Sequence, residues 1–180
     1  NVITSKDGDV VLKGNSSDVP YIKVGTQFFD DLPVATFPDL DRACGQLILD
    51  SPTSVSLSVI DQPYKITGTY SDGGTNREFT TSAAGVLEHT GESGRFLVNG
   101  TSDLEVNKTS RVTYMLYVNG ALVTGAETPH DFAANSKIEH ISITRIVDVS
   151  TGDEIEVCAK SDTVNTNIDV NDLSVNFVRI

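Results

Sequence analysis

The sequence contains no tryptophan, a single methionine and few basic residues, with 13 lysines and arginines against 25 acidic residues and a net charge of −12. This scarcity of positive charge argues against nucleic-acid and anionic-membrane partners, because both need clustered lysine and arginine. No apolar run approaches the ~20 residues that span a bilayer. Without tryptophan, a carbohydrate-binding surface lacks its best stacking platform. We therefore expect neither nucleic acid nor a membrane as a partner.

Neither the cysteines nor the histidines form a recognisable site in the sequence. Cys44 and Cys158 match no metal or redox spacing, and we expect buried thiols because apolar-flanked cysteine is a common core residue. A disulfide between them is the alternative if the protein faces an oxidising compartment. His89, His130 and His140 fall in no metal-binding array, which favours surface or structural roles.

Local motifs for catalysis are also missing, since there is neither a GxSxG nucleophile elbow nor a phosphate-binding glycine loop. A triad assembled across the fold would leave no such motif, because triads are recognised by geometry. The acidic positions Asp30, Asp31, Asp169 and Asp172 lack the order of a calcium-binding loop. We therefore predict no catalytic residue, no metal site, no cofactor and a non-enzymatic role.

What the sequence does contain is a succession of short β-prone segments separated by turn signals. From about residue 43 onward apolar and polar residues alternate, and no segment carries a capped helical stripe; even 130–137 is predicted as a turn or a single helical turn. The predicted strands are 45–50, 54–60, 64–70, 77–83, 85–90, 94–106, 111–118, 121–127, 137–149, 154–161 and 168–180. So many short strands predict one all-β antiparallel domain, a sandwich, jelly roll or barrel, because these folds hide sheet edges.

Residues 1–42 differ from the rest, because proline, glycine, asparagine and aspartate interrupt short extended pieces at 9–14 and 21–25. Proline removes a backbone donor and biases its predecessor towards extended conformations, so we predict an extended arm without long helices. Within this arm, Leu32, Val34 and Phe37 need an apolar surface to lie against. That surface is either the chain's own domain or a partner or neighbouring subunit.

Two turns are specified by their residues. Asn119-Gly120 stands between two β-prone runs and predicts a type I′ hairpin, because both central residues of that turn need positive φ. Gly152-Asp153 predicts a second turn, in which the glycine takes positive φ and the aspartate bonds to nearby backbone. Both turns would fix strand register, since a slip of one residue would move core side chains to the wrong face.

Aromatic residues in the strands have two alternative roles. Tyr70, Tyr114, Tyr117 and Phe96 occupy alternating strand positions, which favours the core or a subunit interface. The alternative is a carbohydrate-binding surface of the kind that aromatic side chains form in lectins.

Residues 43–180 resemble a known group of jelly rolls. The resemblance is carried by YKITGTY, GVLEHTGESGRFLVNGTSDLEV, VTYMLYVNGALV, HISITRIVDVSTGDEIEVCAKS and IDVNDLSVNFVRI. These segments are similar to the TNF/C1q-like jelly rolls of bacteriophage structural proteins. In that group a "tGe…F.V.g" segment precedes a "yyl.vNG" hairpin, and a "gD.i.v.v.n" strand precedes a final "v…l.v..i" strand. The resemblance implies an antiparallel jelly-roll sandwich for residues 43–180.

The same resemblance implies assembly, because jelly rolls of this group usually form homotrimers with aromatic and aliphatic residues around a threefold axis. The expected interface or core positions are Phe96, Tyr114, Tyr117 and Phe177. Phage members of the group serve as capsid decoration or head-fibre proteins, so we expect a virion protein on the outer capsid surface. Residues 1–42 would then anchor the knob, 43–180, to the major capsid protein. The expected capsid-contacting residues of this arm are Tyr21, Ile22, Leu32, Val34 and Phe37.

Two other functions are left open by the sequence. One is a tail-fibre or spike knob that recognises a glycan or protein receptor on the host surface. The other is a secreted C1q-like or lectin-like binding module with a Cys44–Cys158 disulfide. Residues 1–43 contain no heptad, collagen-like or β-helical shaft repeat, which favours a decoration protein over a long fibre tip.

Overall fold

The computed structural model describes residues 11–13, 21–24, 27–29, 43–74, 76–133 and 138–180. The chain divides into two compact units, Asn1–Asp41 and Arg42–Ile180. The described part of the first unit is a small antiparallel sheet in the order β1-β2-β3. Its strands are Val11–Lys13, Tyr21–Val24 and Gln27–Phe29.

The described residues of the predicted arm therefore form strands that pair with one another, rather than a single extended segment. β1 and β2 coincide with the predicted extended pieces, and β3, which was not predicted, pairs with β2 through Ile22 and Phe29. Tyr21 and Ile22 belong to β2. Leu32, Val34 and Phe37 lie outside the described residues.

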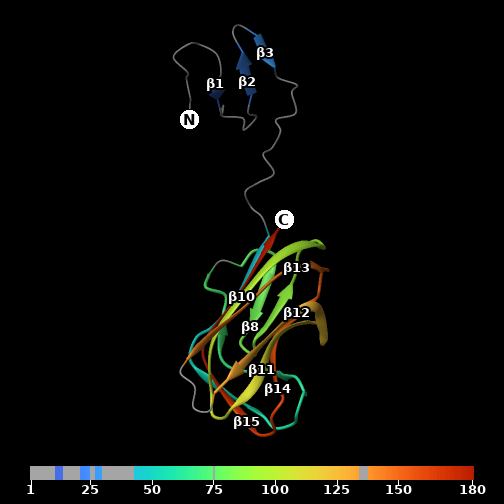
Figure 1. Cartoon of the computed structure of the whole chain (residues 1–180). Helices are drawn as coiled ribbons and strands as arrows, with labels where there is room; N and C mark the ends of the chain where they lie inside the picture. Colours follow the sequence, from blue (N-terminus) through green and yellow to red (C-terminus); the bar gives the residue numbers. More distant parts are fainter. Residues whose placement is uncertain (1–10, 14–20, 25–26, 30–42, 75, 134–137) are drawn as a thin grey trace. The chain divides into compact units, whose positions relative to one another are not determined.

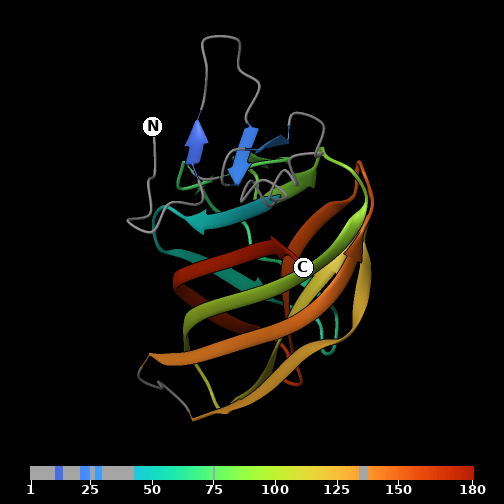
Figure 2. The same ribbon diagram turned by 90° about the horizontal axis from the view of Figure 1, so that it is seen from above.

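The second unit consists, in its described residues, of two six-stranded antiparallel sheets (Figure 1). The first, called here the β10 sheet, has the order β13-β10-β15-β4-β7 with β5 paired to β15. Its strands are Glu139–Val149, Gly94–Val106, Thr166–Arg179, Cys44–Leu49, Tyr70–Ser71 and Thr53–Leu57. Figure 2 shows β10 in green between the dark red β15 and the orange β13.

The second sheet, called here the β11 sheet, has the order β12-β11-β14-β9-β8 with β6 paired to β14. Its strands are Ala121–Phe132, Ser110–Val118, Glu154–Ser161, Val86–His89, Phe79–Ser82 and Tyr64–Lys65. All strand pairs in both sheets are antiparallel.

One face of each sheet is buried in a shared core. The burial pattern alternates residue by residue along β10 and β4, as a strand with one buried face requires. It also alternates along β15, except at Asn171 and Asp172, where the register with β10 shifts. Phe96 and Phe177 are completely buried, and their ring centroids lie 6.4 Å apart, while Phe79 lies 5.3 Å from Phe96. These observations confirm the predicted all-β antiparallel sandwich.

Strand boundaries show where the sequence pattern was sufficient. β10 and β14 begin and end at the predicted residues. The predicted strand 64–70 is instead divided into β6 and β7, because the chain here crosses from the β11 sheet to the β10 sheet. Ile66, which is 1% exposed, fills the core at this crossing, and the Tyr70 hydroxyl donates to its carbonyl at 2.9 Å.

The predicted turn at 130–137 was wrong in its first part. His130, Asp131 and Phe132 continue β12, because each pairs with a residue of β11. β12 is an edge strand of its sheet, so its outward polar side chains stay in solvent, where Asp131 pairs with Arg111. The polar composition of these residues therefore predicted a turn, although the pairing between β11 and β12 continues through them.

The two predicted turns have the expected backbone conformations. Asn119 and Gly120 both have positive φ, 51° and 72°. Gly152 has φ 84°, and the Asp153 carboxylate accepts from the Ser150 amide at 2.7 Å. Among the described residues, no helix is long and apolar enough to cross a membrane.

Candidate functional site: a charge-free face of the sandwich

The outward face of the β10 sheet has a central area without a single ionisable carboxylate or basic side chain. Strand register aligns twelve outward residues of β13, β10, β15 and β4 in three rows of four. The rows are Ile146–Leu97–Val178–Cys44, Thr144–Asn99–Asn176–Gln46 and Ser142–Thr101–Ser174–Ile48. We call these twelve residues the charge-free face.

One row of the charge-free face is apolar and open to solvent. Ile146 is 60% exposed, Leu97 41% and Val178 40%. They stand on three adjacent strands, so their side chains form a continuous band rather than scattered contacts. Isolated surface aliphatics are ordinary, but a contiguous exposed apolar band is typical of a surface that another molecule covers.

In each of the two polar rows beside this band, one pair of side chains already forms a hydrogen bond within the row. The hydroxyls of Thr101 and Ser174 lie 3.0 Å apart on neighbouring strands, and the Thr144 hydroxyl donates to the Asn99 amide oxygen at 3.4 Å. Polar groups that have partners within their own face are cheaper to bury, because less of their hydrogen bonding to water is lost. These rows are therefore compatible with burial in an interface.

Charged residues border the charge-free face at both ends of its strands. Beyond the apolar row, Arg95 of β10 pairs with Asp148 of β13 at 3.0 Å. Beyond the hydroxyl row, His140 Nδ1 lies 2.7 Å from Asp103 Oδ1. A neutral centre with a charged rim is the composition that protein interfaces commonly show.

The outward face of the β11 sheet has the opposite composition. The Lys65 ammonium lies 2.8 Å from the Glu156 carboxylate, and Arg111 donates to Asp131 at 2.7 and 2.9 Å. Through this hydrogen bond, and then through its charge, the Arg111 guanidinium holds the pKa of the Asp131 carboxyl below its usual value. The Arg111–Asp131 pair is mostly exposed and the Lys65–Glu156 pair is part-buried, so this sheet face presents charged side chains around a buried Cys158.

The two cysteines lie on opposite surfaces of the sandwich. Cys44 is an outward residue of β4 in the β10 sheet, and Cys158 is an outward residue of β14 in the β11 sheet. Packed sheets are ~10 Å apart, so thiols that point away from both sheets cannot form a disulfide within one chain. Cys158 is buried, and burial raises the pKa of its thiol to about 12, whereas Cys44 is half-buried at the end of the apolar row.

The aromatic residues predicted for an interface or core lie outside the charge-free face, and three of the four are in the core. Phe96, Tyr114 and Phe177 are core residues, at most 1% exposed. Tyr117 is partly exposed, but it faces outward from the β11 sheet, opposite Glu156. Because Tyr70 is also buried, these aromatics do not form the carbohydrate platform that the sequence left open.

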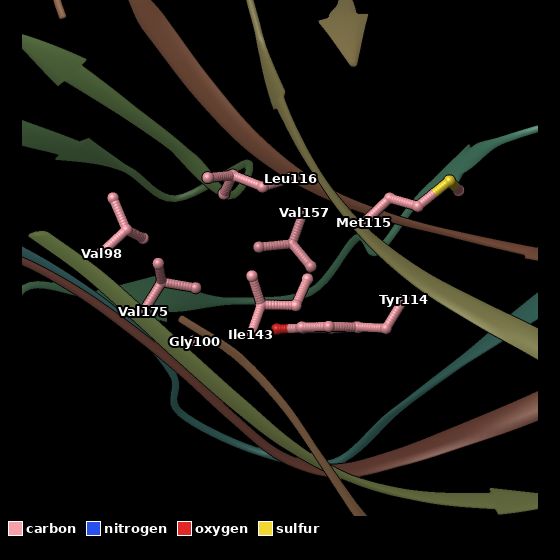
Figure 3. Close-up of a pocket in the computed structure, with 8 residues that line it drawn as sticks. All are labelled: Val98, Gly100, Tyr114, Met115, Leu116, Ile143, Val157 and Val175. Atoms are coloured by element: carbon pink, nitrogen blue, oxygen red, sulfur yellow. The ribbon is translucent and has the colours of Figure 1, made fainter. Parts of the chain in front are cut away.

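A small cavity lies in the core beneath the charge-free face (Figure 3). Its volume is about 10 Å³, and it is lined by Val98, Gly100, Tyr114, Met115, Leu116, Ile143, Val157 and Val175. Figure 3 shows the Tyr114 hydroxyl directed towards Ile143 and Gly100, whereas the Met115 side chain points away. The Tyr114 hydroxyl has no hydrogen-bond partner. This space holds no ligand of any size, so the candidate site is on the surface.

The three histidines do not converge on a common site. His89 is completely buried with Nδ1 3.1 Å from the Ser150 carbonyl, and His130 Nε2 lies 3.3 Å from Glu139. Within the part of the chain that the structure describes, no three histidine, cysteine or acidic side chains are grouped so as to hold a metal ion.

No protein-family model and no curated protein matches this sequence. Solved structures match its fold. The structure of Eiger TNF from S. frugiperda matches with a TM-score of 0.58 at 10% identity, covering 77% of this chain and 92% of that one. Murine APRIL matches with a TM-score of 0.57 at 11% identity, covering 77% and 99%. The second unit is therefore a TNF-like jelly-roll β-sandwich.

Proposed function

We propose that this protein is a non-enzymatic homotrimeric module that assembles through the charge-free face. The observation that carries the proposal is the distribution of charge. Copies of a chain with net charge −12 repel each other, and a face without acidic side chains adds least to that repulsion when a second copy covers it. The three central rows of the β10 sheet offer such a surface, with an exposed aliphatic band to supply the driving force.

The fold supports the number of copies. The TNF/C1q-like jelly rolls that the sequence resembles usually form trimers, and the TNF-like fold of residues 43–180 is in place. A threefold interface is heterologous, so the charge-free face would contact a different surface of the next copy. Cys44 would then lie at the margin of a buried contact.

Assembly is tested on the unmodified chain. Light scattering across a dilution series is expected to give about three times the 19.3 kDa chain at high concentration. Alkylation of Cys44 reports the same equilibrium, because its thiol should react more slowly when a second copy covers the apolar row. A mass of one chain at every concentration would contradict the proposal.

Within this class we propose the role of a capsid decoration protein on the outer surface of a phage virion, with residues 1–42 as the anchor to the major capsid protein. Three anchors on one trimer would multiply weak contacts through effective concentration. The ion pairs on the outward β11 sheet suit a surface left in solvent. The sequence resemblance supports this role, since the TNF-like fold is common to many functions.

The anchor is tested by binding to capsid shells that lack the protein. Deletion of residues 1–42, or Leu32→Asp together with Phe37→Asp in the full chain, should abolish attachment. The mass of the assembly in solution should stay unchanged, because the charge-free face lies in residues 43–180. Attachment that survives both variants would exclude the anchor assignment.

A receptor-binding knob is the second candidate, and one observation favours it. Val59, Ile60 and Val164 are 49%, 51% and 47% exposed on two loops joined by a bond from the Asp61 amide to the Ser161 carbonyl. This loop pair lies at the opposite end of β15 from Arg179, which bonds to Ala43 at the start of the sandwich. Binding to host cells that is lost on Ile60→Asp would favour this candidate, whereas a decoration protein should ignore cells.

A further inference from the structure

The turn at Asn119 is tied to a second turn by side-chain hydrogen bonds. Asn119 Nδ2 donates to Asp153 Oδ1 at 2.7 Å, and Asn119 Oδ1 accepts from the Glu154 amide at 2.9 Å. The Asn119 amide also donates to the Glu154 carbonyl at 2.8 Å. The end of the β11–β12 hairpin is therefore fixed to the start of β14.

The Asn119-Gly120 pair is chemically vulnerable. In an asparagine-glycine sequence the glycine nitrogen can attack the asparagine Cγ, forming a five-membered succinimide while Nδ2 leaves as ammonia. Water then opens the ring to aspartate or isoaspartate. Glycine makes this attack easy because it has no side chain to obstruct it, and the type I′ turn favours glycine at this position.

The observed contacts oppose this attack. Both polar atoms of the Asn119 side chain are held by the segment that begins β14, so Cγ reaches the Gly120 nitrogen only after both bonds break. The acceptor is itself fixed, because Asp153 Oδ2 accepts from the Ser150 amide at 2.7 Å. The neighbouring pair Val118 and Ile155 continues the ladder between β11 and β14. Opening therefore requires the two turns to separate.

We propose that Asn119 is a spontaneous deamidation site of this protein, held unreactive by Asp153 and Glu154 while the two turns stay joined. Deamidation would replace the Nδ2 donor by a carboxylate oxygen facing the Asp153 carboxylate. The two negative charges would repel, so the tie could not re-form. Deamidation during a transient separation of the two turns would therefore make that separation permanent. This inference is independent of the proposed function.

A second asparagine-glycine pair provides an internal control. Asn99-Gly100 lies within β10, and Gly100 is paired on both sides, with Ile143 of β13 and Val175 of β15. Its nitrogen becomes available for attack only when the sheet opens. Asn99 therefore reports opening of the whole domain, whereas Asn119 reports local separation of the two turns.

The experiment compares deamidation rates at both asparagines by peptide mapping and mass spectrometry after incubation in mildly alkaline buffer. The samples are the full chain, the Asp153→Ala and Asp153→Asn variants, and a synthetic peptide of residues 115–124. In the native chain Asn119 should deamidate at least about tenfold more slowly than in the peptide, as for a locally protected site. Asp153→Ala should accelerate the reaction, and Asp153→Asn, which keeps an acceptor oxygen, should not.

The deciding quantity is the ratio of the Asn119 rate to the Asn99 rate, because global unfolding accelerates both. The proposal requires this ratio to rise in Asp153→Ala and to stay near the native value in Asp153→Asn. Equal Asn119 rates in the native chain and the peptide would overturn it. An unchanged ratio in Asp153→Ala would overturn it as well.

Discussion

The two outward faces of the sandwich carry opposite chemistry on equivalent architecture. The charge-free face of the β10 sheet presents aliphatic, hydroxyl and amide side chains, whereas the β11 sheet presents ion pairs such as Lys65–Glu156 and Arg111–Asp131. Both sheets are antiparallel, and both bury their other face in the same core. Folding requires only the inward residues, so the difference between the outward faces reflects what each face meets.

The absence of charge from part of a surface can be as informative as a charged cluster. In a chain with 25 acidic residues, water-covered strands would be expected to carry some of them at twelve adjacent positions. The β11 sheet does so, and the β10 sheet does so only beyond the three rows. Its outward acidic residues there are Asp148 at one end and Asp103, Glu105, Asp169 and Asp172 at the other. On this sheet face the charged side chains lie only around the edge of an uncharged area. Protein interfaces commonly have this arrangement, so the face is suited to contact with another protein surface.

The largest effect on self-association is expected when a single charge is placed on one outward face and compared with a charge placed on the other. Leu97 and Leu122 are matched, because both are outward leucines, 41% and 40% exposed, on opposite sheets. Leu97→Glu should weaken self-association at least ~100-fold, since an unpaired buried charge costs about 3 kcal/mol or more. Leu122→Glu should leave association unchanged. Sedimentation or light scattering of both variants measures the difference, and equal effects would remove the distinction between the faces.

The thiols provide the next largest contrast without any substitution. At high dilution Cys44 should react readily with an alkylating reagent at neutral pH, whereas Cys158 should not react until the chain unfolds. Burial raises the pKa of the Cys158 thiol to about 12, so almost none of it is thiolate at neutral pH, in addition to being shielded. Mass spectrometry of the labelled peptides distinguishes the two sites, and faster labelling of Cys158 would contradict the described core.

A substitution in the core, between the two sheets, should change the free energy of unfolding without affecting self-association. The Tyr114 hydroxyl is buried without a partner, and this burial raises its pKa. Tyr114→Phe removes an unsatisfied group and should increase the free energy of unfolding by about 1 kcal/mol. Denaturant titration measures the change. A loss of stability would show that the hydroxyl has a partner, such as a bound water.

The smallest effect is expected on the charged face itself. Arg111 and Asp131 form a bidentate pair, but both side chains are mostly exposed. Arg111→Ala should therefore lower the free energy of unfolding only slightly, and self-association should not change. A loss of assembly in this variant would move the interface to the β11 sheet.

Sequence patterns were sufficient wherever the physics is local. Alternation along 94–106 and 154–161 identified two strands to the residue, because one buried face forces a period of two. The pattern failed at 64–70, where the chain changes sheets at Ile66, and at His130, where a polar edge strand resembles a turn. Both failures depend on neighbours that are distant in the sequence.

The candidate face was outside the reach of the sequence for the same reason. Its aromatic candidates, Phe96 and Phe177, are core residues, and the face is made by the residues that follow them, Leu97 and Val178. One signal was present, since the central outward positions of three strands carry threonine, serine, asparagine and aliphatic residues without charge. That signal acquires meaning only when the strands are known to be neighbours.

Most of the strands, the Asn119-Gly120 and Gly152-Asp153 turns and the all-β class could be predicted from the sequence alone, because these follow from side-chain period and backbone φ. Only the tertiary structure decided that Ile146, Leu97, Val178 and Cys44 lie in one row. These residues belong to strands that are not consecutive in the chain, and antiparallel register fixes their alignment. Hydrogen bonds between strands that are distant in the sequence place these four side chains side by side on one surface.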